Sequence, residues 1–81
     1  MSGDVRRLVG RNVRAVRLAA GLSQAALADK MGVDRAYISR LELGQYNPTV
    51  LTLWHLAQAL EVKVGAFFTE SSIRKRSSSV A

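Results

Sequence analysis

The segment that decides the fold is LSQAALADKMGVDRAYISRLEL, which spans residues 22–43. Ser23 stands where a helix N-cap is expected, because a serine hydroxyl accepts a hydrogen bond from the free backbone N–H groups of a first helical turn. The spacing therefore predicts a helix over residues 24–31. Gly32 is expected to end this helix, since glycine enters the left-handed backbone region without steric cost.

A second short helix is predicted over residues 35–43, with Asp34 as its capping residue. Two short helices joined by a sharp turn are typical of a helix-turn-helix. The two helices must cross closely, and Ala28 supplies the small side chain that the crossing needs. Ile38 and Leu41 are expected to point inward and to anchor the second helix from beneath.

The outer face of this second helix is predicted to be polar and basic. A helix presented in this way fits the major groove of DNA, where side chains reach the base edges. The candidate contact residues are Arg35, Ala36, Ser39 and Arg40, with Tyr37 at the edge of the face.

Upstream of the motif, residues 5–20 have the pattern of an amphipathic helix, and Gly21 is expected to end it. Arginines lie opposite the valines, so they form either a solvated face or a set of phosphate contacts. The inward face is predicted to hold Val5, Val9, Val13 and Val16, and the opposite face Arg7, Arg11 and Arg14, with Arg6 and Arg17 on the flank.

Downstream of the motif, residues 44–48 are predicted to form a loop, and Thr49 to cap a fourth helix over residues 50–60. A short fifth helix is expected around residues 64–69. No segment alternates at period two, so the predicted fold class is all-α, with five helices. The residues expected to face inward, including one from the turn between the second and third helices, are Val33, Val50, Leu53, Leu56, Ala57, Leu60 and Phe67.

The predicted domain spans residues 5–69, and residues 70–81 form a basic, serine-rich tail. Such a tail is expected to be mobile, either as a solvated end or as an arm that binds DNA without sequence preference.

The charge balance favours a polyanionic partner. The chain has 81 residues and a formal net charge of +6, with a sequence pI near 10.9. Residues 1–21 alone carry five arginines against one aspartate. A strongly basic small domain is typical of a nucleic-acid-binding protein. Its thin core also makes a binding module a better expectation than an enzyme.

The residue inventory argues against catalysis, metal binding and membrane insertion. The sequence holds no cysteine and one histidine, His55, and no nucleophile–base spacing resembles a catalytic triad. No apolar run approaches the roughly 18 residues needed to span a bilayer, and no leader peptide is visible. We therefore expect a cytoplasmic protein that is not an enzyme and needs no cofactor, no metal and no membrane.

Residues 21–62 resemble the phage repressor and Cro type (Xre-like) helix-turn-helix family. The likeness extends to about residues 6–69 and implies a five-helix domain that binds operator DNA, usually as a two-fold dimer. The combination of motifs that carries it is specific. These motifs are Leu22-Ser23-Gln24, Gly32-Val33, Ile38-Ser39, Glu42-x-Gly44, Asn47-Pro48 and Leu56-Ala57.

The resemblance implies particular roles for individual side chains. Gln24, with Ser23 beside it, matches a family position that contacts a phosphate at a helix N-terminus, where free N–H groups favour an anion. Arg17 and Glu42 match a structural ion pair between the first and third helices. Leu43 departs from the family, because many members carry arginine or asparagine there for a phosphate contact.

Base reading is implied for the second helix of the motif. Arg35 and Arg40 match reading positions, and an arginine binds guanine O6 and N7 in a bidentate way. Ala36 matches a third such position and suits a thymine methyl group, whereas the carboxylate of Asp34 repels phosphate if it faces DNA. The expected DNA-binding set is Ser23, Gln24, Asp34, Arg35, Ala36, Tyr37, Ser39, Arg40 and Asn47.

An apolar surplus on the last two helices predicts a dimer interface. A short chain has little core volume, so large apolar side chains left at its surface favour association with a second copy. The alternative is that Trp54 and Phe68 fill the core of a monomer. The candidate interface consists of Leu51, Trp54, Val64, Ala66 and Phe68.

These expectations together predict a sequence-specific transcriptional regulator that binds double-stranded DNA as a homodimer on a near-palindromic operator. A small repressor and a restriction–modification controller both fit, and RNA polymerase is a further candidate partner. Two other hypotheses remain open. In the first, the chain is a toxin–antitoxin component with a toxin partner. In the second, it is a protein-interaction module built on the same fold.

Overall fold

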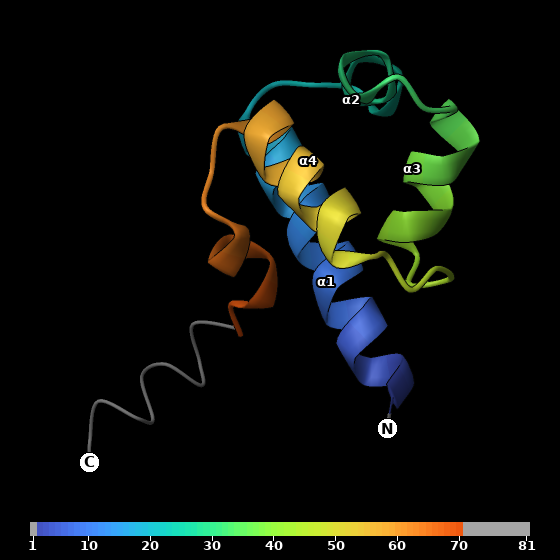
Figure 1. The fold of residues 1–81 in the computed structure, drawn as a ribbon, viewed down its shortest axis with the longest axis vertical. Coiled ribbons are helices and arrows are strands. Elements are labelled where there is room, and N and C mark those ends of the chain that lie inside the picture. The colour runs from blue at the N-terminus through green and yellow to red at the C-terminus, as the bar shows by residue number, and fades with distance from the viewer. Residues whose placement is uncertain (1, 71–81) are drawn as a thin grey trace.

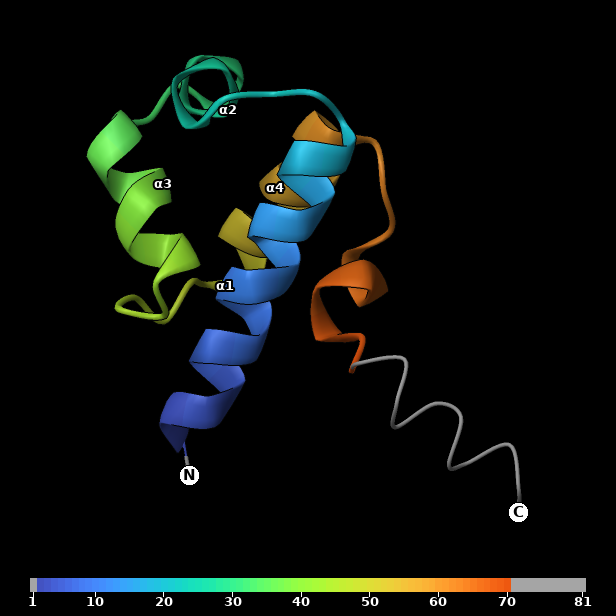
Figure 2. The ribbon, with the colours of Figure 1, turned by 180° about the vertical axis from the view of Figure 1, so that it is seen from behind.

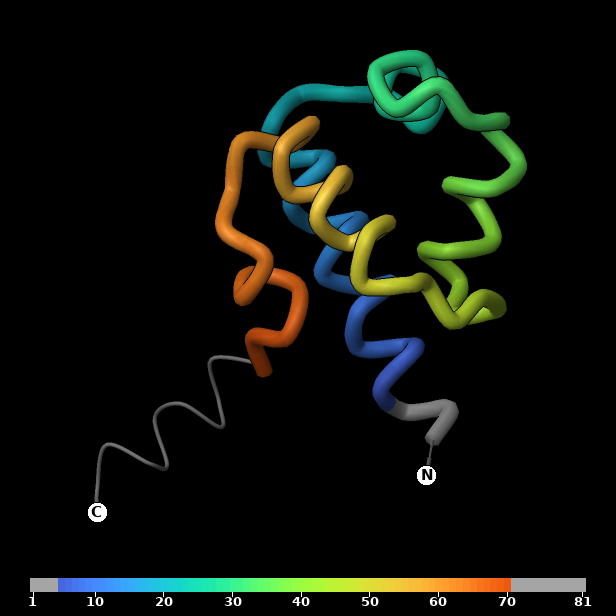
Figure 3. Tube along the Cα trace, viewed as in Figure 1, coloured from blue at the N-terminus to red at the C-terminus, as the bar shows by residue number. Residues whose placement is uncertain are grey.

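The structure, a computed structural model, describes residues 2–70. Within these residues the chain forms helices and no strand, as the sequence predicts (Figures 1 and 3). The fifth element is a short 3₁₀-helix rather than an α-helix, as is common for so few residues. The elements are α1 (Ser2–Ala19), α2 (Gln24–Met31), α3 (Arg35–Glu42), α4 (Val50–Leu60) and η1 (Val64–Phe68).

Two of the three predicted serine, threonine or aspartate caps form as expected. The Ala26 N–H donates to Ser23 Oγ over 3.0 Å at the start of α2, and Thr49 caps α4 in the same way. Gly32 ends α2 with a φ of 71°. The predicted role of Asp34 is wrong in one respect: Asp34 occupies the N-cap position of α3, but its side chain accepts no capping hydrogen bond.

The helices pack around α1, which contacts α3, α4 and η1, while α2 bridges α3 and α4. Figures 1 and 2 show α1 and α4 side by side, with the α2–α3 pair lying across one side of them. Every element contributes to a single apolar core. Its buried members are Val9, Val13, Leu27, Ala28, Ile38, Leu41, Leu53, Leu56, Ala57, Leu60 and Phe67.

Gly10 marks the closest approach of α1 to α3. A Cβ atom at this position would lie 2.6 Å from the carbonyl oxygens of both Leu41 and Glu42, which is far inside van der Waals contact. Only glycine therefore allows the backbone of α1 to touch the last turn of α3. An isolated glycine inside a helical pattern is the sequence signal for such an approach.

Asn12 fastens η1 to α1. Its amide Nδ2 donates to the carbonyl oxygen of Phe67 over 2.8 Å and to that of Thr69 over 2.9 Å. Asn12 is not among the residues that the sequence predicts to be important. Its signal is an amide side chain placed next to the valines of the inward face.

Three valines expected to face inward are exposed instead. Val50 is 84% exposed because it occupies the first position of α4, and the core contact begins one turn later at Leu53. Val5 lies in α1 before its first core residue, Val9, and Val33 lies in the turn between α2 and α3. The first helix also begins at Ser2 rather than at residue 5. The predicted tail beyond Glu70 lies outside the described residues.

Candidate nucleic-acid interface

Helix α3 has one buried and one exposed side. Ile38 and Leu41 are 0% and 1% exposed, so they anchor the helix from beneath as predicted. Their burial leaves the other side of an eight-residue helix open to solvent. That exposed side carries Arg35, Ala36 and Arg40, with Tyr37 and Ser39 half-buried at its borders.

The predicted pair of Arg17 and Glu42 forms a buried ion pair between α1 and α3. Arg17 Nε donates to Glu42 Oε2 over 2.6 Å, and Arg17 Nη2 donates to Glu42 Oε1 over 3.0 Å. A third donor, Arg17 Nη1, binds the carbonyl oxygen of Leu22 over 2.9 Å. The hydrogen bond to Glu42 raises the pKa of Arg17 above its ordinary value, although burial acts in the opposite direction. The last turn of α3 is therefore held to the end of α1.

Gln24 connects α2 to the same carboxylate. Its Nε2 donates to Glu42 Oε1 over 3.1 Å, so the first residue of α2 is braced against the last residue of α3. The Ser23 hydroxyl caps α2 from the adjacent position. A helix N-terminus offers backbone N–H groups and a partial positive charge to an anion. Ser23 and Gln24 thus sit where a phosphate would be bound.

Tyr46, which the sequence analysis did not select, braces the exposed side of α3. Its ring stacks on Tyr37, with centroids 5.0 Å apart and an interplanar angle of 23°. Its hydroxyl also accepts a hydrogen bond from Arg40 Nη1 over 3.4 Å. The loop after α3 therefore supports one of the two exposed arginines of this helix. The sequence signal for this contact is a second tyrosine in the loop a few residues after the motif that contains Tyr37.

The two remaining members of the predicted DNA-binding set lie at the ends of α3. Asp34 is exposed at the start of the helix, and its carboxylate is not engaged in capping. Asn47 is exposed in the loop that follows the helix. Asp34 directly precedes Arg35, and Asn47 directly follows Tyr46, the tyrosine that binds Arg40.

The predicted dimer patch is partly exposed. Leu51, Trp54 and Phe68 are 63%, 53% and 45% exposed, whereas Val64 and Ala66 are half-buried. Helix α4 packs directly against η1, so the patch lies on two neighbouring elements. The alternative that Trp54 and Phe68 fill the monomer core is therefore wrong.

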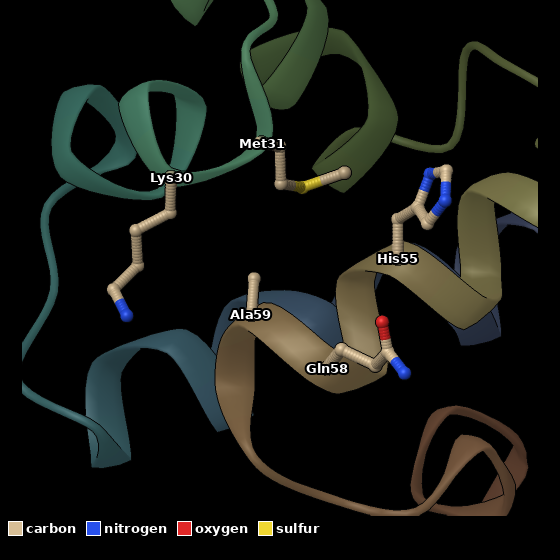
Figure 4. A pocket seen from close by; sticks show the side chains of 5 residues that line it. All are labelled: Lys30, Met31, His55, Gln58 and Ala59. Carbon is tan, nitrogen blue, oxygen red and sulfur yellow. The ribbon is translucent and has the colours of Figure 1, made fainter.

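A hollow between α2 and α4 is a weaker candidate for a binding site. It is lined by Lys30 and Met31 of α2 and by His55, Gln58 and Ala59 of α4 (Figure 4). The amine of Lys30 and the ring of His55 lie at opposite ends of the hollow, so its polar groups do not converge on one point. Ligand sites usually place several polar groups around one ligand.

Over residues 2–70, no group of three or more histidine, aspartate or glutamate side chains is placed to hold a metal ion. The described helices are also too short or too polar for any of them to cross a bilayer.

Comparison with known proteins identifies the family of this chain. A helix-turn-helix family model matches residues 13–67, which is more than half of the chain. An uncharacterized HTH-type transcriptional regulator of Sinorhizobium fredii is 48% identical over 59 residues, covering 73% of this chain and 77% of the relative. The control protein C.SmaI of Serratia marcescens is 35% identical, covering 88% and 84%.

The chain spans only part of some relatives. The immunity repressor of Bacillus phage phi105 is 36% identical over 83% of this chain, which corresponds to 46% of the repressor.

Solved structures show the same arrangement of helices. The restriction-modification controller protein C.AhdI from Aeromonas hydrophila has a TM-score of 0.74 and 37% identity, covering 80% of this chain and 97% of that protein. The hypothetical transcription factor NHTF from Neisseria has a TM-score of 0.80 and 29% identity, covering 89% of this chain and 83% of that protein.

Proposed function

Because the chain belongs to the helix-turn-helix family of the Xre/Cro-C1 type, we propose that it binds a near-palindromic operator as a homodimer. The chain is a transcriptional regulator of the controller and repressor type. Its relatives include a phage immunity repressor and a control protein. The observation that carries the proposal is the exposed arginine pair on α3, a helix whose other side is fully buried.

In this mechanism α3 enters the major groove and reads base edges. Arg35 and Arg40 each suit guanine O6 and N7, and each such contact discriminates against a wrong base by about 1–3 kcal/mol. Ala36 suits the methyl group of thymine. The hydroxyl of Tyr46 holds Arg40 at one side of the helix, which limits the directions from which this arginine approaches a base.

The N-terminus of α2 sets the depth and angle of this docking. Gln24 and Ser23 suit one phosphate at the edge of the groove. Since Glu42 binds both Gln24 and Arg17, the phosphate-binding end of α2 and the last turn of α3 move as one unit. A phosphate contact therefore fixes the register in which α3 meets the bases.

A homodimer would place two copies of α3 on the same DNA. The exposed side chains of Leu51, Trp54 and Phe68 offer an apolar surface for a second copy. Two-fold symmetry would place the two α3 helices about 34–36 Å apart, which is one turn of DNA, and so requires a near-palindromic site. Occupancy of such a site next to a promoter would then block or contact RNA polymerase.

The DNA-binding proposal is tested by selection from a random duplex library at two salt concentrations. The wild type should enrich a near-palindrome with half-sites one helical turn apart. The Arg35→Ala/Arg40→Ala variant should fold but lose that enrichment. Lys30→Ala/Lys63→Ala is the matched control, because it removes two positive charges outside the proposed interface and should keep the enriched sequence.

Two results would contradict the proposal. One is an arginine variant that retains both the affinity and the sequence preference of the wild type. The other is wild-type binding that is weak, steeply salt-dependent and blind to sequence, because the positive charge would then act only as nonspecific attraction. The dimer has a separate test: Leu51→Lys should lower the molecular mass seen by sedimentation without changing the helical circular dichroism.

A further inference from the structure

The exposed arginines of α1 take no part in the function proposed above. Arg7, Arg11 and Arg14 follow one another at intervals of four and three residues, so they lie along one side of the helix. We name them the arginine stripe. No aspartate or glutamate occurs between residues 5 and 20, and the like charges of Arg11 and Arg14, three residues apart, destabilise the helix. A polyanion that neutralises the stripe would remove this repulsion.

The arginine stripe begins beside the end of α3. A Cβ atom on Gly44 would lie 2.8 Å from Cγ of Arg7, so the N-terminal part of α1 touches the loop after α3. Figures 1 and 2 both show this loop reaching α1. One turn beyond the stripe, Arg17 binds Glu42, which also binds Gln24 at the start of α2. The stripe therefore runs between the loop after α3 and the phosphate-binding end of α2.

Leu43 supplies no phosphate-binding group at this edge of the molecule. It is 64% exposed at the C-cap of α3, and its side chain offers no hydrogen-bond donor. Arg11 and Arg14 are exposed on α1, the helix that packs on α3, and they form no hydrogen bond or ion pair within residues 2–70.

We infer that the arginine stripe binds the phosphate backbone of DNA just outside the bases that α3 reads. The inference rests on the proposed function, because it takes α3 as docked in the major groove. Contacts to phosphate release counterions and are independent of sequence. The stripe therefore lengthens the bound segment of DNA and adds affinity, but it adds no base preference.

The test varies the length of DNA on either side of the operator. The enriched site is placed in one duplex that ends at the site and in another extended by about one helical turn on each side. The wild type should bind the longer duplex more tightly. Arg11→Ala/Arg14→Ala should lose this gain, while selection should return the same preferred sequence. Lys30→Ala/Lys63→Ala is again the control of equal charge and should keep the gain.

Salt dependence supplies the second readout. The plot of log K against log salt has a negative slope, and each lost phosphate contact makes it less steep by about 1. The arginine variant should therefore show a slope less steep by about 2 on the longer duplex. The lysine control should keep the wild-type slope. Both variants change exposed side chains, so circular dichroism should report an unchanged fold.

Failure of the inference and failure of the proposed function give different results. If the wild type enriches an operator but the arginine variant matches the lysine control in slope and in gain from the flanks, the inference alone is overturned. If the wild type enriches no sequence, the proposed function is overturned and the inference falls with it.

Discussion

The buried and exposed sides of α3 differ in how firmly their side chains are held. On the buried side, Ile38 and Leu41 are enclosed by the core, and Glu42 is fixed by a bidentate ion pair. On the exposed side, Arg40 has one long hydrogen bond to a loop tyrosine, and Arg35 faces solvent. The core and the ion pair fix the position of α3. The side chains proposed to read bases lie outside both, so they can be exchanged without loss of the fold.

The largest loss of stability is expected from a substitution on the buried side of α3. Glu42→Ala leaves the guanidinium of Arg17 buried without its partner, which typically costs about 3–5 kcal/mol in the free energy of unfolding. For a domain this small, such a loss approaches its whole stability. Urea denaturation followed by circular dichroism measures it. Leu43→Ala, which changes the exposed neighbour of Glu42, is the control and should cost little. A loss below that of the control would refute the anchoring role of the pair.

A somewhat smaller effect is expected where α1 touches α3. Gly10→Ala places a methyl group against two carbonyl oxygens of α3, and overpacking of this kind costs about 1–3 kcal/mol. The thermal midpoint of unfolding reports the change. Gly65→Ala is the matched control, because nothing lies within 4 Å of an added Cβ there. Equal midpoints for the two variants would show that the α1–α3 contact relaxes freely.

On the exposed side of α3, a substitution should change DNA recognition and leave the stability of the fold nearly unchanged. Arg35→Ala is expected to change the free energy of unfolding by less than about 0.5 kcal/mol, as surface substitutions usually do. It should nevertheless reduce discrimination at one base pair by about 1–3 kcal/mol. Competition binding with operators changed one base pair at a time measures the second quantity. A stability loss with unchanged base preference would mean that Arg35 supports the fold and does not read DNA.

The smallest expected effect concerns the start of α3. Thr49→Ala removes a capping hydrogen bond from α4 and should cost about 1 kcal/mol. Asp34→Ala removes no such bond, so only the attraction between its carboxylate and the helix dipole is lost, at about 0.3–1 kcal/mol. Chemical denaturation of the two variants side by side tests this order. A larger loss for Asp34→Ala would indicate that its carboxylate caps α3 in solution.

Most of the helical framework could be predicted from local chemistry. Ser23 and Thr49 cap helices because a hydroxyl satisfies free N–H groups, and Gly32 ends a helix because it adopts a left-handed conformation. These rules act within a few residues and need no knowledge of the fold. The ion pair of Arg17 and Glu42 joins residues far apart in sequence, and only the family resemblance suggested it.

The features that sequence reasoning missed depend on how the elements meet in space. Gly10 matters because the carbonyl groups of another helix lie against it, and Asn12 matters because η1 ends beside it. Val50 shows the reverse error, since it continues the apolar pattern of α4 but lies beyond the reach of the core. The structure leaves Arg35, Ala36 and Arg40 exposed on α3, but which of the predicted DNA-binding residues touch DNA stays a prediction.

The shared carboxylate of Glu42 has a consequence for the change in heat capacity on binding. Because Gln24 and Arg17 meet on it in the free protein, α2 and α3 already hold one relative orientation before DNA arrives. Docking such a preorganised pair orders few additional residues, so it costs little conformational entropy. The change in heat capacity on binding should then correspond to the surface buried at the interface alone, without the larger negative value that accompanies folding coupled to binding.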